Sequence, residues 1–267
     1  MTIITICYNL FIGYRPFGNI FVDIEGFMKR FAIVLLLVAG FIFVAQAGFS
    51  TTYILHLNGM CSTNWLDGKG TARLANAPGY VSVNCYVDNR STIAYSASQF
   101  KSNYLDVYCK GSNWCYIVNY SAGDVIMGYI NANYTPQWNI AYVYTTAGAG
   151  GGSEIAIKGI SDLFTCNLAS QLGVSTVRNM YNHNDTNGIT IYHIGGYKGI
   201  FGSSVLLPGE DDGAVAYHSA GACVNSGSYT NLCSCTHWTN HVIAYTCTGY
   251  YLDHYGMKMK FIYQLGW

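Results

Sequence analysis

Short apolar runs bounded by polar, glycine-containing turns alternate with longer amphipathic stretches along most of the chain. Five of the runs have the length and composition of buried strands, at 53–57, 80–87, 115–118, 140–144 and 189–193. The stretches 96–108, 124–133 and 161–181 have helical spacing, and 242–246 or the segment beyond it is a further helix candidate. Strands that alternate with helices predict an α/β fold with a mainly parallel sheet covered on both faces.

The N-terminal region has a different pattern. Met28-Lys29-Arg30 is a short basic start, 31–44 is an unbroken apolar run, and Ala45-Gln46-Ala47 is a small-x-small cleavage site. The run is shorter than the roughly 20 residues of a membrane-spanning helix, so an uncleaved anchor is the less favoured alternative. We expect 1–27 to be an upstream extension, 28–47 a signal peptide, and 48–267 a secreted or periplasmic catalytic domain without a transmembrane span.

Length and charge limit the function classes. The 267 residues suffice for one large domain with a substantial core. Lys and Arg number 13, as do Asp and Glu, so the formal net charge is zero. Because nucleic-acid binding requires an excess of positive charge, we expect no nucleic-acid partner.

The cysteine content agrees with export. The chain has ten cysteines, and removal of the leader with Cys7 leaves an odd number. An oxidising compartment would pair most of them and leave at least one free or paired between molecules. Cys115 lies inside an apolar run, and we therefore predict that it is the free, buried thiol.

The segment 114–129, WCYIVNYSAGDVIMGY, contains the candidate nucleophile. A strand-like run leads into Asn119-Tyr120-Ser121-Ala122-Gly123, and a helix-like pattern follows. This is the layout of a nucleophile elbow, in which a sharp turn exposes a serine beyond the carboxyl end of a strand. The turn needs small neighbours because the serine is strained and lies close to other backbone. Asn119 is a departure, since the usual motif has Gly there.

Four segments in order resemble the α/β-hydrolase superfamily and, within it, the secreted bacterial triacylglycerol lipases and esterases. They are YILHLNGM (53–60), NYSAG (119–123), TTAGAGGGSEIA (145–156) and PGEDDGAVAYHSA (208–220). The resemblance covers 53–249 and implies the α/β-hydrolase fold. Asn58 stands where these lipases have His.

The resemblance also implies a Ser-Asp-His triad in that chain order. Ser121 is the expected nucleophile. Asp212 is the expected acid because Gly213-Ala214-Val215 follows it, and Asp211 is the alternative. Four histidines compete for the base: His218, His237, His241 and His254. His241 matches best, because these lipases carry an Asn-His or Asp-His pair before an apolar helix start, and His237 is next.

The remaining site elements also follow from position. Backbone N–H groups of Met60 and Ala122 are the expected oxyanion hole, and Gly59 lets the first loop approach closely. The predicted reaction is cleavage of carboxylic esters through an acyl-enzyme, without a cofactor or metal. The expected partners are an ester or lipid substrate and a lipid interface. Residues 165–181, with Phe164 and Phe201, are expected to form a cap over an apolar acyl pocket.

Other functions are also open. The same triad could hydrolyse amides or phospholipids or transfer acyl groups, and Asn119 and Asn58 would fit an inert binding protein. Cys233-x-Cys235-x-His237-x-x-x-His241 has zinc-ligand residue types, but its spacing is uncommon and an exported chain would oxidise these cysteines. Glycosylation sequons begin at Asn89, Asn133 and Asn184.

Overall fold

The computed structural model describes residues 30–32, 34, 50–64, 79–135, 137–157, 166–183, 189, 191–220, 243–245 and 249–263. The chain divides into two units, Met1–Phe49 and Ser50–Trp267. The second unit contains the sheet and the candidate site. None of the helices within the described ranges is long and apolar enough to cross a membrane.

Within the described residues, the sheet has six strands in the order β2-β1-β3-β4-β5-β6, and each neighbouring pair is parallel. Their bounds are β1 Thr52–Leu57, β2 Tyr80–Asn84, β3 Trp114–Tyr120, β4 Ile140–Thr146, β5 Ile191–Ile194 and β6 Ile243–Tyr245. The predicted parallel sheet is thus confirmed. The strand order changes direction between β1 and β3, and the carboxyl ends at such a switch point form the usual site of an open α/β sheet.

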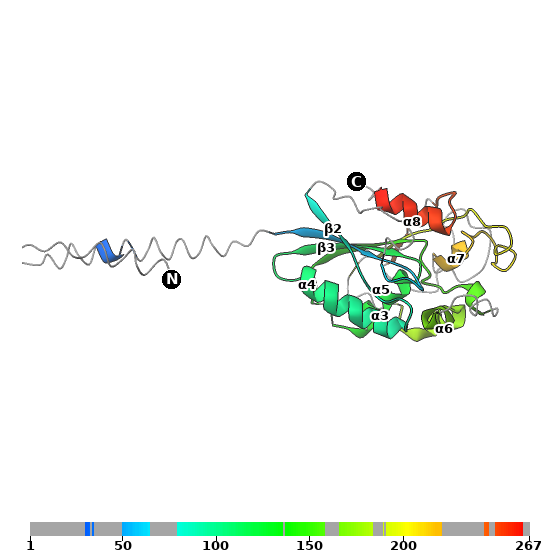
Figure 1. Cartoon of the computed structure of the whole chain (residues 1–267), viewed down its shortest axis with the longest axis horizontal. Coiled ribbons are helices and arrows are strands. Elements are labelled where there is room, and N and C mark those ends of the chain that lie inside the picture. The colour runs from blue at the N-terminus through cyan, green and yellow to red at the C-terminus, as the bar shows by residue number, and fades with distance from the viewer. Residues whose placement is uncertain are drawn as a thin grey trace, which may run out of the picture. The chain divides into compact units, whose positions relative to one another are not determined.

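Helices lie on both faces of this sheet, as predicted. Figure 1 shows α3, α4 and α5 on one face and α8 on the other. Their bounds are α3 Ile93–Phe100, α4 Asp106–Tyr108, α5 Gly123–Asn133, α6 Val174–Met180, α7 Tyr217–Ala220 and α8 His254–Tyr263. A π-helical segment, η1 Lys101–Leu105, joins α3 to α4, and η2 Glu154–Ile157 and η4 Asn167–Gln171 are single 3-10 turns. The segment 243–245 is a strand, and the predicted C-terminal helix lies beyond it as α8.

The core follows from the two-residue period of the strands. Leu55 and Ile117 pack on the side of α3 and α5, whereas their neighbours Ile54 and Val118 face Met257 of α8. All five side chains are almost fully buried. Because successive strand residues point to opposite faces, continuous apolar runs such as 115–118 identify strands covered on both sides.

Two disulfides are present in the described part of the chain, Cys61–Cys166 and Cys109–Cys115. Cys85 is the free, buried thiol among these residues. The prediction that Cys115 is free was therefore wrong. Its burial was inferred correctly, but Cys109 follows α4 and its Cα lies 5.4 Å from that of Cys115, so the buried group is a disulfide.

Candidate active site

Ser121 occupies a strained turn between β3 and α5. Its φ angle is 55°, in the left-handed region that non-glycine residues rarely adopt. A Cβ on Gly123 would lie 2.9 Å from the carbonyl oxygen of Leu57, so only glycine fits there. Asn119 lies at the end of β3, fully buried, with its amide 3.5 Å from Thr145 Oγ1. The local geometry is that of the elbow expected from the sequence.

The imidazole that reaches Ser121 belongs to His254, the first residue of α8. Its Nε2 lies 3.0 Å from Ser121 Oγ. The ring of Tyr120 packs against that of His254 with 4.8 Å between centroids. A serine hydroxyl within hydrogen-bond reach of an imidazole is the arrangement that activates a nucleophile.

Asp212 completes the arrangement. Its Oδ2 lies 2.8 Å from His254 Nδ1, and its Oδ1 accepts hydrogen bonds from the N–H groups of Ala214 and Val215 at 3.0 and 2.8 Å. The Asp212 carbonyl also accepts from the His254 N–H at 2.7 Å, which ties the acid loop to the start of α8. Both carboxylate oxygens are therefore fixed.

The neighbouring Asp211 has a different environment. Its Oδ1 accepts hydrogen bonds from the Gly213 N–H and from Ser204 Oγ, both at 2.7 Å. These contacts close the turn that Gly213 makes at a φ of 93°. Of the two candidate acids, the geometry therefore brings Asp212 to the imidazole and gives Asp211 a role in the loop.

The predicted base was His241, whereas the histidine that the structure brings to Ser121 is His254. His237 and His241 lie outside the described residues, while His218 points to Glu154, with 3.2 Å between Nε2 and Oε1. His254 takes the position expected of the base. The signal that could have found it was present: Asp253-His254 is an Asp-His pair that opens a helix, whereas His241 is followed closely by β6.

The loop after β1 lies directly beside the serine. A Cβ on Gly59 would lie 2.7 Å from Ser121 Cβ and 3.1 Å from Ser121 Oγ, so glycine is required for this approach. Asn58 donates its side-chain amide to Ser62 Oγ and to the Asn64 carbonyl. The position of this loop is compatible with the predicted Met60 N–H donor, and Ala122 follows Ser121 at the start of α5.

A second buried acid-histidine pair lies beneath the elbow. Asp124 Oδ2 is 3.4 Å from His193 Nδ1, and both side chains are almost fully buried. Burial raises the pKa of the Asp124 carboxyl. The carboxyl faces the loop after β4, where a Cβ on Gly150 would lie 2.6 Å from Oδ2. The glycine-rich segment 148–152 therefore accommodates this carboxyl and the neighbouring backbone.

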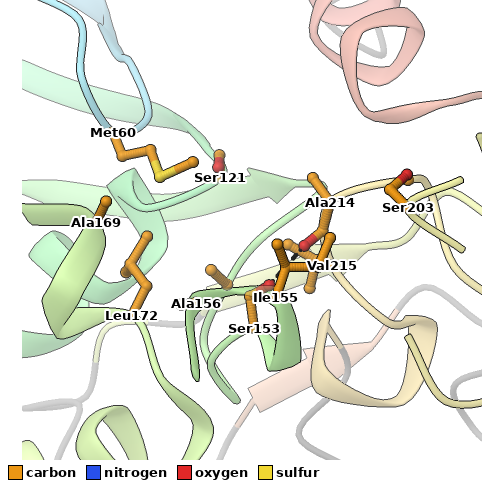
Figure 2. Close-up of a pocket in the computed structure, with 12 residues that line it drawn as sticks. Met60, Ser121, Ser153, Ile155, Ala156, Ala169, Leu172, Ser203, Ala214 and Val215 are labelled. Atoms are coloured by element: carbon orange, nitrogen blue, oxygen red, sulfur yellow. Dashed lines mark hydrogen bonds between the residues drawn. The ribbon is translucent and has the colours of Figure 1, made fainter. Parts of the chain in front are cut away.

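An apolar pocket of about 140 Å³ opens beside Ser121 (Figure 2). Its walls carry no charged side chain. They are formed by the loops after β1 and β4, the η4 turn and the acid loop. The lining residues are Met60, Ser121, Ala149, Ser153, Ile155, Ala156, Ala169, Leu172, Ser203, Gly213, Ala214 and Val215. Ser153 Oγ donates to the Ala214 carbonyl at 2.6 Å and holds two of the walls together.

The expected cap is only partly observed. Ala169 of η4 and Leu172 line the pocket, so the 165–181 segment contributes a wall. Phe164 lies outside the described residues. Phe201 was expected to cover the pocket, but its side chain is 103 % exposed and it is not among the lining residues.

The parallel sheet with helices on both faces and the elbow after β3 define the α/β-hydrolase fold. Solved structures agree. The fold is similar to that of the mature lipase BlEst2 of Bacillus licheniformis, with a TM-score of 0.55 and 16 % identity. The similarity covers 81 % of this chain and 91 % of the BlEst2 chain. The propeptide form of BlEst2 gives a TM-score of 0.54 at 14 % identity over 79 % of this chain and 50 % of the other. No family model and no curated protein matches the sequence.

Proposed function

We propose that this protein is a serine hydrolase that cleaves carboxylic esters through an acyl-enzyme. Ser121 is the nucleophile, His254 the general base and Asp212 the residue that orients the base. The observation that carries the proposal is the continuous chain of short contacts from Ser121 Oγ to His254 Nε2 at 3.0 Å and from His254 Nδ1 to Asp212 Oδ2 at 2.8 Å.

The geometry supports a standard two-stage sequence. His254 Nε2 accepts the proton of Ser121 as Oγ attacks the ester carbonyl, and Asp212 stabilises the imidazolium. Backbone N–H groups of Met60 and Ala122 stabilise the tetrahedral oxyanion. The C–O bond to the alcohol then breaks, and His254 returns its proton to the departing alkoxide. Water, deprotonated by His254, attacks the acyl-enzyme, and the acid is released as Ser121 regains its proton.

The pocket indicates the acyl group. Its lining is apolar or neutral, with no cation to bind a second carboxylate. Its volume of about 140 Å³ suits a short or medium-length, uncharged acyl chain. The similarity in fold to a lipase supports an ester substrate over an amide.

The proposed function includes export from the cytoplasm. We propose that 28–47 is a cleaved signal peptide and that the mature domain begins near Gly48. The division between the two units falls after Phe49, close to that site. The disulfides Cys61–Cys166 and Cys109–Cys115 require an oxidising compartment to form and persist.

The rim of the pocket supports contact with a lipid interface. Residues 199–209, GIFGSSVLLPG, contain no charged side chain. Ile200, Phe201 and Val205 in this segment are 46, 103 and 83 % exposed, and Ser203 between them lines the pocket. We therefore propose that this loop inserts into lipid aggregates, so that an ester can enter the pocket directly. Replacing Phe201 and Val205 with Ser should slow hydrolysis of emulsified tributyrin and spare that of soluble p-nitrophenyl butyrate.

Covalent labelling tests the main proposal. The chain from Gly48 onward is incubated with a fluorophosphonate probe, beside Ser121→Ala and His254→Ala. We expect the parent to label, Ser121→Ala to remain unlabelled and His254→Ala to label far more slowly. A folded, disulfide-intact parent that does not label would overturn the proposal and favour an inert binding protein.

A further inference from the structure

The loop after β1, residues 58–62, is held by the turn around Asn89. Asn89 is fully buried. Its Nδ2 donates to the carbonyl oxygens of Asn58 at 2.7 Å and Gly59 at 3.1 Å. Its backbone carbonyl accepts from the Cys61 N–H at 2.9 Å, and its own N–H donates to the Ser62 carbonyl at 3.0 Å. One residue thus contacts nearly every peptide of this loop.

One of these contacts bears directly on the oxyanion hole. The carbonyl of Gly59 and the N–H of Met60 belong to the same planar peptide group and point in opposite directions. When Asn89 Nδ2 binds the Gly59 carbonyl, it fixes the orientation of that plane and hence the direction of the Met60 N–H. Residue 59 must itself be glycine, because a Cβ there would lie 2.7 Å from Ser121 Cβ.

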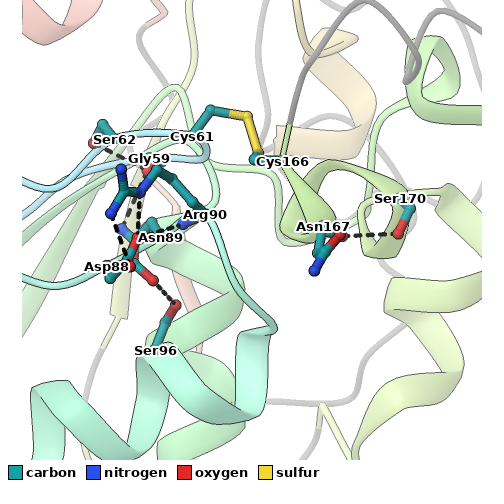
Figure 3. Close-up of a disulfide and its surroundings, with 10 residues drawn as sticks. All are labelled: Gly59, Cys61, Ser62, Asp88, Asn89, Arg90, Ser96, Cys166, Asn167 and Ser170. Carbon is teal, nitrogen blue, oxygen red and sulfur yellow. Dashed lines mark hydrogen bonds and ion pairs between the residues drawn. A yellow bond between two sulfur atoms is a disulfide. The ribbon is translucent and has the colours of Figure 1, made fainter.

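A disulfide connects the same loop to the pocket. Cys61 has a φ of 56° and is bonded to Cys166, the residue that precedes η4 (Figure 3). The N–H of Asn167 donates to the Arg90 carbonyl at 2.9 Å, so the turn that carries Asn89 also contacts η4. Ala169 and Leu172, in and just after η4, line the pocket.

We propose that Asn89 is a positioning residue for the oxyanion hole, and that the Cys61–Cys166 disulfide holds the same loop against the pocket wall. This inference rests on the proposed hydrolase function. It assigns Asn89 to catalysis through the Met60 peptide and not to contact with the substrate. The same contacts exclude Asn89 as a glycan acceptor despite its sequon, because its amide is buried and already donates to two carbonyls.

The test compares Asn89→Ala, the size-matched Asn89→Asp and a Cys61→Ser/Cys166→Ser double variant. Matched controls are Asn133→Ala, which changes an exposed Asn of another sequon, and Cys109→Ser/Cys115→Ser, which removes the disulfide at the amino end of β3. Each protein is assayed with p-nitrophenyl butyrate and with butylboronic acid, a tetrahedral adduct former. Assays are run well below the Tm of every variant, with folding checked by near-UV circular dichroism.

In the three test variants kcat should fall at least about tenfold, since misdirected donors lose transition-state stabilisation. The affinity for butylboronic acid should fall in parallel while KM changes less than about threefold. The controls should keep kcat within about twofold, whatever their Tm. A purely structural role would lower Tm without this split between kcat and KM.

The outcomes distinguish the proposed hydrolase function from the proposed positioning role of Asn89. If the parent labels with fluorophosphonate and hydrolyses the ester, but folded Asn89→Ala and Asn89→Asp keep kcat and boronate affinity within twofold, only the positioning role is overturned. If only the Cys61→Ser/Cys166→Ser variant keeps kcat and boronate affinity within twofold, the part of the proposal that concerns the disulfide is overturned. If the parent neither labels nor hydrolyses, the hydrolase function falls and the positioning role falls with it.

Discussion

His254 Nε2 lies 3.0 Å from Ser121 Oγ, although 133 residues separate the two in the chain. The contact forms because β3 ends just before Ser121 and α8 begins at His254 on the opposite face of the sheet from α5 (Figure 1). Asp212 is joined to His254 through both its side chain and its backbone carbonyl. The acid loop therefore contacts the start of α8 and orients the imidazole.

The first prediction separates His254 from His241. His254→Ala should lower kcat/KM for p-nitrophenyl butyrate by at least about 10⁴-fold, because Ser121 loses its base. His241→Ala should retain activity within about threefold. Steady-state kinetics of both variants, with matched circular dichroism spectra, make the comparison. A larger loss in His241→Ala than in His254→Ala would return the base to His241.

The second prediction concerns the two neighbouring acids. Asp212→Asn should keep the fold but lower kcat by roughly 10⁴-fold, because an amide at this place favours the wrong imidazole tautomer. Asp211→Asn removes a charged acceptor from the Gly213 turn and should cost about 1–2 kcal/mol of stability with a small effect on kcat. Urea unfolding and kinetics on both variants would distinguish these effects. Comparable losses of kcat would contradict the assignment.

The fold and the sharp turn at Ser121 could be predicted from local patterns. Apolar runs such as Cys115–Val118 must be covered on both faces, and the small residues around Ser121 are needed only where a strand turns sharply into a helix. These are constraints between neighbours in the chain, so the sequence shows them directly. β1 to β5 were placed correctly to within a few residues for the same reason, whereas β6 falls in a segment that was offered as a helix candidate.

The histidine that contacts Ser121 and the disulfides could not be predicted in this way, because they depend on contacts between distant segments. The distance from Asp212 to a histidine is set by where α8 packs on the sheet, and no local pattern specifies this. Cys115 similarly showed its burial but not its partner, because Cys109 approaches it only after α4 turns back towards β3. The Asp253-His254 pair was a usable signal, but Asn240-His241 resembled it.

A third prediction concerns acyl-chain selectivity. Leu172 is nearly fully buried and forms one wall of the pocket beside η4. Leu172→Ala should lengthen the pocket. The ratio of kcat/KM for longer p-nitrophenyl esters to kcat/KM for the acetate should rise by at least about fivefold, since each methylene that binds in an apolar pocket contributes about 1–3 kcal/mol to transition-state binding. It should also cost about 2–5 kcal/mol of stability. An unchanged chain-length profile in folded protein would show that the acyl group binds elsewhere.

A fourth prediction concerns stability and pH. Burial raises the pKa of Asp106, but hydrogen bonds from Lys101, Lys110 and Trp138 outweigh it and hold that pKa below its ordinary value. Because this pKa is lower in the folded state than in the unfolded state (about 3.9), ionised Asp106 stabilises the folded protein at pH values above about 3.9. This stabilisation is lost as the pH falls towards the folded-state pKa. Asp106→Asn should thus cost about 1 kcal/mol at pH 7, with the difference shrinking below about pH 4. Urea titrations at pH 7 and pH 3 test this, and a pH-independent difference would contradict it.

The last prediction concerns Gly59, whose missing side chain lets the loop after β1 reach the serine. A methyl group there would lie 2.7 Å from Ser121 Cβ, well inside van der Waals contact, so the loop or the serine must move. Gly59→Ala should lower kcat by about 100-fold, because a displacement of even about 1 Å moves the Met60 N–H away from the oxyanion. Gly79→Ala is a control for adding a methyl group, since a Cβ at Gly79 meets nothing within 4 Å, although its φ of 81° adds backbone strain. Kinetics with p-nitrophenyl butyrate and thermal unfolding of both variants separate loss of stability from loss of catalysis. We expect Gly79→Ala to lower Tm and keep kcat. We expect Gly59→Ala to lose kcat at a temperature where it is fully folded. A folded Gly59→Ala protein with parental kcat would show that this loop does not form the oxyanion hole.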